Sequence, residues 1–316
     1  MPLSPAGVCQ ASLVAISAGI LVLTVVPKHL RTALMAYGAR RDHDAASNTA
    51  KKQADAGQGG KTETRHNASH LLRPWTLTVP HSWFLSYYVL SVTSSAFWAW
   101  QFWRRGSLMT AMAQAQVRLE PQAMHHYQQL PHVILAWAML SIQGCRRLYE
   151  CLFVSKLGSS PMLVLHWLLG LAFYSLAGVS VWIQGSGAIL EPWQSSSPNA
   201  LLTWRVPLAL ALFAAATLKQ NECHGHLASL KKYTLPNKGL FSRLVCPHYT
   251  CECVIYLAIA LMAAPAGALF NRCVLSCLLF TIVNLGLTAH DTKQWYAQKF
   301  GAQQVANKWI MIPFVF

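Results

Sequence analysis

Charged side chains are scarce in this sequence. Asp, Glu, Lys and Arg make up 11% of its 316 residues, whereas a soluble domain carries about 25%. Acidic residues are the scarcest, with 10 Asp and Glu against 25 Lys and Arg, which gives a net charge of +15. Hydrophobic residues account for 54%. The composition therefore argues against an ordinary soluble protein and favours a membrane protein.

The hydrophobic residues are gathered in blocks about as long as a bilayer is thick, roughly 20 residues each. Seven such blocks lie at 8–27, 83–103, 132–154, 161–184, 200–218, 251–270 and 273–290. The predicted fold class is all-α, a polytopic membrane protein with seven transmembrane helices. Only Asn271 and Arg272 separate the last two blocks, which predicts a very tight turn there.

The stretch before the first block, "MPLSPAGVCQ", has no Lys or Arg, whereas a signal peptide begins with a basic region. Basic residues follow the block instead. Lys and Arg are also frequent in the loops 28–82 and 219–249 and in the C-terminal tail, and absent from the loop 185–199. By the positive-inside rule, the N-terminus is predicted to be lumenal and the C-terminus cytosolic. The loop 104–131, with Arg104 and Arg105 beside a span, fits this pattern least well.

The positive charge therefore needs no nucleic acid partner, because cytosolic loops use it to attract anionic lipids or an anionic cofactor. We expect one membrane domain over 1–316, interrupted by a disordered cytosolic insertion at 40–70 that is polar and poor in aromatic residues. After this insertion, Trp83, Tyr87 and Tyr88 are predicted to lie at the membrane interface, where aromatic side chains are frequent.

Polar residues within or beside apolar spans are costly, which makes them candidates for function. Arg146 and Arg147 lie four and three residues before Glu150, so both pairs share a helix face. They form either a structural ion pair or a phosphate site, since the guanidinium fork suits phosphate. Gln220, His224 and Lys231 fall along one stripe if the fifth helix continues beyond its span. The alternative is a solvated helix at the membrane surface.

The stretch "LVCPHYTCECVIYL" raises the question of a metal site. Pro247 suits the first turn of a helix, which would place His248 and Glu252 on one face, four residues apart. Structural zinc sites use short paired spacings that this stretch lacks, and Cys251 and Cys253 would point in nearly opposite directions. We therefore predict no metal and interpret the cysteines as small buried residues. An odd number of nine cysteines also argues against a disulfide framework.

Several motifs together resemble the steroid 5α-reductase family, and most closely its polyprenol/polyprenal reductase branch. They are "YTLPNKGLFSRLVCPHYTCECVIY" (233–256), "WYAQKF" (295–300) with the terminal "IPFVF", "RRLYECL" (146–152) and, more faintly, "VPHSWFLSYYVLSV" (79–92). The resemblance covers 131–316, the expected reductase core. It implies a membrane oxidoreductase of the endoplasmic reticulum that uses NADPH and a long-chain isoprenoid lipid in dolichol biosynthesis for protein N-glycosylation.

Carried over position by position, the resemblance implies a set of cofactor-binding residues, namely Arg147, Gln220, His224, Lys231, Tyr233, His248, Glu252 and Tyr296. His248 stands where the family more often has Asn, and His224 stands where the steroid enzymes have Asp. Two further departures from the steroid enzymes bear on the substrate. Gly144 stands where they have a catalytic tyrosine, and Thr288 stands where they have a basic residue. Both departures favour a polyprenol-type substrate and leave the proton donor unassigned.

Hydride adds readily to a carbon–carbon double bond only when a conjugated carbonyl can take up the negative charge. The expected acceptor is therefore polyprenal, even if the pathway runs from polyprenol to dolichol. Candidates for contact with its oxygen are Tyr149, Gln143 and Arg146. The main alternative function is an S-adenosylmethionine-dependent membrane methyltransferase of the isoprenylcysteine or phospholipid type, which carries a related "P-x-Y-x-x-E" motif. A lipid-binding protein without enzymatic activity is a third hypothesis.

Overall fold

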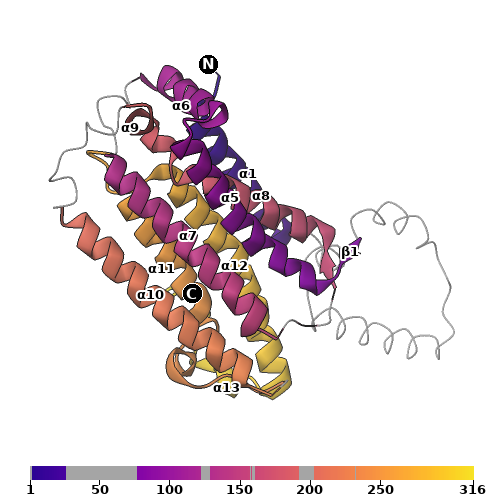
Figure 1. Ribbon diagram of the computed structural model, residues 1–316. Coiled ribbons are helices and arrows are strands. Elements are labelled where there is room, and N and C mark those ends of the chain that lie inside the picture. The colour runs from indigo at the N-terminus through magenta and orange to yellow at the C-terminus, as the bar shows by residue number, and fades with distance from the viewer. Residues whose placement is uncertain are drawn as a thin grey trace.

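The computed structural model describes residues 2–25, 77–121, 129–156, 158, 161–191, 203–231 and 233–316. The insertion predicted at 40–70 lies outside these residues. The described chain is mostly helical, and its long helices lie beside one another in an elongated bundle (Figure 1).

Helices overlie all seven apolar blocks of the sequence. They are α1 (Pro5–Val25), α5 (Leu85–Trp103), α7 (Leu130–Phe153), α8 (Val164–Ser180), α10 (Arg205–Ser229), α11 (Pro247–Met262) and α12 (Arg272–Phe300). Among the described residues, three segments are long and apolar enough to cross a membrane: Pro5–Val25, Val164–Leu190 and Arg272–Phe300. A helical chain with several such segments has the features of a polytopic membrane protein.

Shorter elements complete the described fold. They are β1 (Thr78–Val79), η2 (His81–Phe84), α6 (Ser107–Leu119), β2 (Met162–Leu163), η4 (Ile183–Gly185), α9 (Ser186–Leu190), η6 (Gly239–Ser242) and α13 (Gln303–Ala306). Helix α6 lies within the predicted loop 104–131 and packs against α9. A search for long apolar blocks misses it because it is short and carries polar residues on one side. Arg105 before it donates to the carbonyls of Ile189 and Glu191 at 2.7 and 3.0 Å, at the end of α9.

The connection between the last two long helices differs from the predicted tight turn. Helix α11 ends at Met262 and α12 begins at Arg272, so the segment 263–271 joins them. Pro265 in this segment has no N–H group for a helix. The side chain of Asn271 is buried, accepts a hydrogen bond from the Val274 amide at 3.0 Å and donates to the Ala263 carbonyl at 3.0 Å. Asn271 therefore caps α12 and holds the connection together.

Helix α5 packs against both α7 and α8, and glycines on the partner helices allow this close approach. A Cβ atom at Gly144 of α7 would lie 2.7 Å from the Ser91 hydroxyl oxygen. A Cβ atom at Gly170 of α8 would lie 2.5 Å from the ring of Tyr87. Strands β1 and β2 pair in antiparallel register, Thr78 with Leu163 and Val79 with Met162, and join the start of α5 to the start of α8.

The C-terminal tail holds the start of α11 in place. The amides of Val245 and Cys246 donate to the carbonyls of Trp309 and Ile310 at 2.8 and 3.0 Å. The Trp309 amide donates to the Arg243 carbonyl at 2.9 Å. The Thr250 hydroxyl donates to the Met311 carbonyl. The first turns of α11 are thereby fixed on the side that carries His248 and Glu252.

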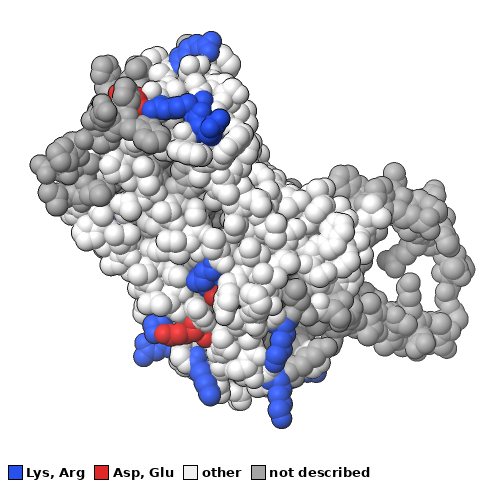
Figure 2. All heavy atoms as spheres, in the orientation of Figure 1, with Lys and Arg blue, Asp and Glu red and all other residues white. Residues whose placement is uncertain are grey.

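Charge is unevenly distributed over the bundle. On the face in Figure 2, described Lys and Arg side chains gather toward its two ends, and a broad band of uncharged described residues separates them. Large apolar side chains are exposed on several helices, including Trp100, Ile142 and Leu218. Exposed apolar surface of this extent is typical of contact with lipid.

Candidate functional site

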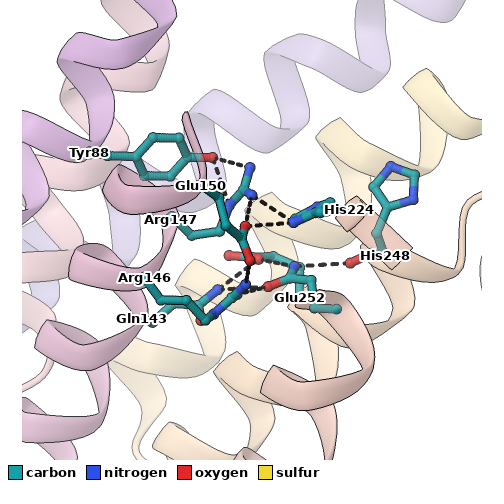
Figure 3. Close-up of polar contacts among 9 residues, drawn as sticks. Tyr88, Gln143, Arg146, Arg147, Glu150, His224, His248 and Glu252 are labelled. Carbon is teal, nitrogen blue, oxygen red and sulfur yellow. Dashed lines mark hydrogen bonds and ion pairs between the residues drawn. The ribbon is translucent and has the colours of Figure 1, made fainter. Parts of the chain in front are cut away.

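A cluster of polar side chains lies inside the bundle where α5, α7, α10 and α11 meet (Figure 3). The central anion is Glu150 of α7, of which 1% of the side chain is exposed. It pairs with Arg146 and Arg147 of the same helix. The predicted pairs at three- and four-residue spacing are confirmed, and they lie within the protein rather than in a solvated surface.

The amide side chains of Gln143 and Gln220 link helices α7, α10 and α11. Gln143 of α7 donates to the side-chain oxygen of Gln220 on α10 at 3.0 Å and to Glu252 of α11 at 3.0 Å. Gln220 donates to the His248 carbonyl at 3.0 Å and also to Glu252. Arg146 donates to both amide oxygens. The cluster thus contains two guanidinium groups and two carboxylates, and their formal charges balance.

His224 of α10 lies against the ion pair. Its Nδ1 atom is 2.7 Å from Arg147 Nη1 and 2.7 Å from Glu150 Oε2. The imidazole is 11% exposed. Burial lowers the pKa of His224, the nearby Arg147 lowers it further, and the hydrogen bond to Glu150 partly opposes the decrease. His224 is therefore neutral near pH 7.

Tyr88 of α5 completes the cluster, although the sequence placed it at the membrane interface. The exposed fraction of its side chain is 6%. Its oxygen accepts hydrogen bonds from Arg147 Nε at 3.2 Å and Nη2 at 2.9 Å. Tyr87 is buried too, whereas Trp83 is exposed. Packing of α5 against α7 and α8 directs both tyrosine side chains into the protein, and their position at the level of the membrane interface stays a prediction.

Several polar atoms of the cluster have no partner in the described part of the chain. They include the buried Arg146 Nε and His248 Nδ1 atoms. Glu252 accepts its hydrogen bonds at Oε2 alone, so Oε1 is open to a further donor. Buried polar atoms are seldom left without a partner in native proteins, so Arg146 Nε and His248 Nδ1 are candidates for contact with a ligand.

The structure places the remaining predicted site residues outside this cluster. Tyr149 is 60% exposed and packs against Phe153 at 5.1 Å between ring centroids. Lys231 is exposed. The rings of Tyr233 and Tyr296 both contact that of Trp295, with centroid distances of 6.2 and 5.5 Å. Gly144 faces Ser91 of α5, so a larger side chain there would collide with that helix.

A second group of side chains lies at the C-terminal end of α12. Lys299 is 5.2 Å from the ring centre of Tyr233, and Trp295, Tyr296 and Phe300 pack together beside it. Tyr233 has a backbone φ of 64°, which is uncommon for a residue other than glycine. This aromatic and basic surface suits a flat ring that carries a nearby phosphate. No group of three or more His, Cys, Asp or Glu residues within the described ranges could hold a metal ion.

Comparison with known proteins gives a consistent result. Residues 160–316 match the family model described as 3-oxo-5-alpha-steroid 4-dehydrogenase. The chain is 33% identical over 196 residues to polyprenal reductase of Xenopus tropicalis, covering 58% of this chain and 61% of that protein. It is 32% identical over 186 residues to polyprenal reductase of Saccharomyces cerevisiae, covering 58% and 65%.

The chain is also 24% identical over 290 residues to polyprenal reductase 2 of Oryza sativa subsp. indica. This alignment covers 75% of this chain and 80% of that protein. The matched part thus spans less than two thirds of the frog and yeast relatives and four fifths of the rice relative. The C-terminal part of the chain, residues 160–316, is thus similar to the family described as 3-oxo-5-alpha-steroid 4-dehydrogenase, and the chain is similar to the polyprenal reductases of frog, yeast and rice.

Proposed function

We propose that this protein is a membrane oxidoreductase that uses NADPH to reduce the α-isoprene double bond of polyprenal on the route to dolichol. The observation that carries this proposal is a buried polar cluster with unpartnered atoms in a chain related to polyprenal reductases. The S-adenosylmethionine-dependent methyltransferase is disfavoured by these relatives.

The residues present fit a dinucleotide. Among the described residues, His248 Nδ1 has no hydrogen-bond partner, and Glu252 accepts hydrogen bonds at Oε2. These two side chains would hold the carboxamide or ribose end of NADPH. Tyr233, Trp295 and Tyr296 would stack against its adenine, with Lys299 and Lys231 near the phosphates. Arg147 is already bonded to Glu150 and Tyr88, so we assign it to positioning within the site rather than to a free phosphate contact.

The chemistry that NADPH would supply when bound is hydride transfer to the β-carbon of the enal. The chain must then stabilise negative charge on the aldehyde oxygen, as an oxyanion hole does. Gln143 and Arg146 lie in the cluster, where Arg146 Nε still has a proton to donate. The exposed Tyr149 lies away from them. Of the three oxygen contacts expected from the sequence, Arg146 has the best position.

The isoprenoid chain of the substrate would remain in lipid or between helices, because it is apolar and only its aldehyde needs to reach the cluster. We further propose seven membrane spans, a lumenal N-terminus, a cytosolic C-terminus and location in the endoplasmic reticulum. The reductase core would be 131–316. We also propose one functional domain over 1–316. This proposal is supported by the packing of α1 against α12 and by the hydrogen bond between Arg147 and Tyr88, which join the N-terminal helices to the core.

The test follows NADPH oxidation by the purified protein in lipid nanodiscs, with polyprenal, polyprenol or a steroid enone as the acceptor. We expect turnover with polyprenal only. Glu252→Gln removes the charge that Gln143 and Gln220 contact, and we expect kcat/KM to fall about 100-fold, comparable to the loss of one preorganised polar contact.

The matched control is Glu222→Gln on α10. Among the described residues, the exposed Glu222 pairs with the exposed Lys219, and such surface pairs contribute about 0–1 kcal/mol. Activity of this variant should equal that of the wild type. Absence of NADPH oxidation with all three acceptors would refute the reductase proposal, and binding of S-adenosylmethionine would then be measured by calorimetry.

A further inference from the structure

Two consecutive tyrosines on α5 differ in what their hydroxyl groups contact. The Tyr87 hydroxyl is 3.1 Å from the His166 carbonyl oxygen and 3.3 Å from Met162 Sδ. It therefore has an acceptor, and it joins α5 to the start of α8. The Tyr88 hydroxyl instead lies against the Arg147 guanidinium, with both hydrogen bonds donated by that group.

The proton of the Tyr88 hydroxyl has no acceptor among the residues that the structure describes. Its bonds, at 3.2 and 2.9 Å, both run to guanidinium nitrogens, and guanidinium nitrogens are donors only. A buried donor without an acceptor costs about 1–3 kcal/mol. Such a group is retained where a ligand supplies the missing acceptor.

The surroundings of Tyr88 fix this donor in position. Arg147 lies 4.9 Å from the centre of the Tyr88 ring and is itself held by Glu150 and His224. The rings of Phe84 and Tyr174 pack edge-on against Tyr88 at 5.6 Å. The positive charge of Arg147 beside the Tyr88 oxygen favours donation of the hydroxyl proton, because it would balance the charge of the phenolate that remains. Figure 3 shows the hydroxyl directed toward the centre of the cluster.

We propose that Tyr88 is the catalytic acid of this site and that it donates its proton to the carbonyl oxygen of the substrate. This inference rests on the proposed function. As a hydride adds to the β-carbon, the π electrons move to the aldehyde oxygen, and the Tyr88 proton follows to give an enol and a phenolate. Arg147 balances the phenolate charge. Protonation of the α-carbon from water and return of the enol proton to Tyr88 then release the saturated aldehyde.

The first experiment compares Tyr88→Phe with Tyr87→Phe in nanodiscs, with NADPH and polyprenal as substrates. We expect Tyr88→Phe to lower kcat about 100-fold or more, as removal of a general acid does, with unchanged KM for NADPH. Tyr87→Phe loses contacts between α5 and α8 instead. It should keep kcat within about two- to threefold of the wild type, because it removes no proton donor to the substrate and the pairing of β1 with β2 still joins the starts of the two helices.

A second measurement separates proton donation from a structural role. Incorporation of 3-fluorotyrosine at position 88 preserves the ring and the hydrogen bonds but makes the phenol more acidic. In the fluorotyrosine protein, we expect the alkaline limb of the pH profile of kcat to move to lower pH. In Tyr88→Phe, we expect that limb to be absent.

Three results would overturn the assignment. One is wild-type activity in Tyr88→Phe, and another is an unmoved alkaline limb with fluorotyrosine. The third is an equal loss of kcat and of NADPH binding in Tyr88→Phe and Tyr87→Phe. Each of these leaves the reductase proposal intact if the wild type oxidises NADPH with polyprenal. An inactive wild type would instead refute both proposals.

Discussion

At the scale of single residues, Glu150 determines how the cluster is held together. Its buried carboxylate pairs with two guanidinium groups and lies 2.7 Å from His224. Removal of one partner from a buried ion pair costs about 3–5 kcal/mol, because the remaining charge loses its counterion. The arginines of this motif are therefore bonded to Glu150, and they also contact Tyr88, Gln143 and Gln220.

The depressed pKa of His224 predicts a pH dependence of stability. His224 lies beyond the predicted span 200–218, and it faces Glu150 and Arg147 of α7 and His248 of α11. Its folded-state pKa lies below the ordinary value, so the unfolded chain takes up the proton first as pH falls. The contribution of His224 to the free energy of unfolding is fully present above the unfolded-state pKa of about 6.5, and it is lost as pH falls toward the folded-state pKa.

The corresponding measurement is thermal unfolding in detergent between pH 7.5 and 5.5 for the wild type and His224→Gln. We expect the wild type to lose more stability on acidification than the variant, by at most about 1.4 kcal/mol per pH unit from one proton. Other histidines contribute equally to both proteins and cancel in the difference. Parallel pH profiles for the two proteins would contradict the prediction.

At the scale of elements, glycines decide how closely α5 approaches its neighbours. A Cβ atom at Gly170 would lie 2.5 Å from two ring carbons of Tyr87, and this ring is held by bonds to Met162 and His166. We therefore expect Gly170→Ala to destabilise the protein by about 1–3 kcal/mol, as overpacking does. The measurement is the denaturation midpoint in detergent.

Gly19 of α1 is the matched control, because a Cβ atom there would meet nothing within 4 Å. Alanine is a better helix former than glycine by about 0.5–1 kcal/mol, so Gly19→Ala should be neutral or stabilising. Equal midpoints for the two variants would show that α5 and α8 lie farther apart than the structure has them.

At the scale of the whole molecule, the uneven charge distribution predicts an orientation in the membrane. Lys238, Arg243, Lys299 and Lys308 all follow the fifth apolar block, and basic residues remain on the cytosolic side. In sealed microsomes, a tag after Phe316 should be digested by added protease, whereas a tag before Met1 should be protected. A lumenal marker protein serves as the control for intact membranes. Protection of the C-terminal tag would contradict the orientation.

The sequence by itself determined the helical, apolar character of the chain and the spacing that pairs Glu150 with Arg146 and Arg147. Both depend on local periodicity, which can be read along one helix. Its motifs also resembled those of a known family, and that resemblance grouped Gln220, His224 and Glu252 with Arg147 as cofactor-binding residues, which stays a prediction.

Only the tertiary structure decided which side chains share one environment. The inward position of Tyr88 depends on close packing of α5 against α7 and α8, at Gly144 and Gly170, and no feature of the α5 sequence distinguishes it from an interfacial tyrosine. Tyr149 lies on the outer face of α7 although it is adjacent in sequence to Glu150. Neighbouring residues on a helix point in different directions, and the partner helices determine which direction faces the site.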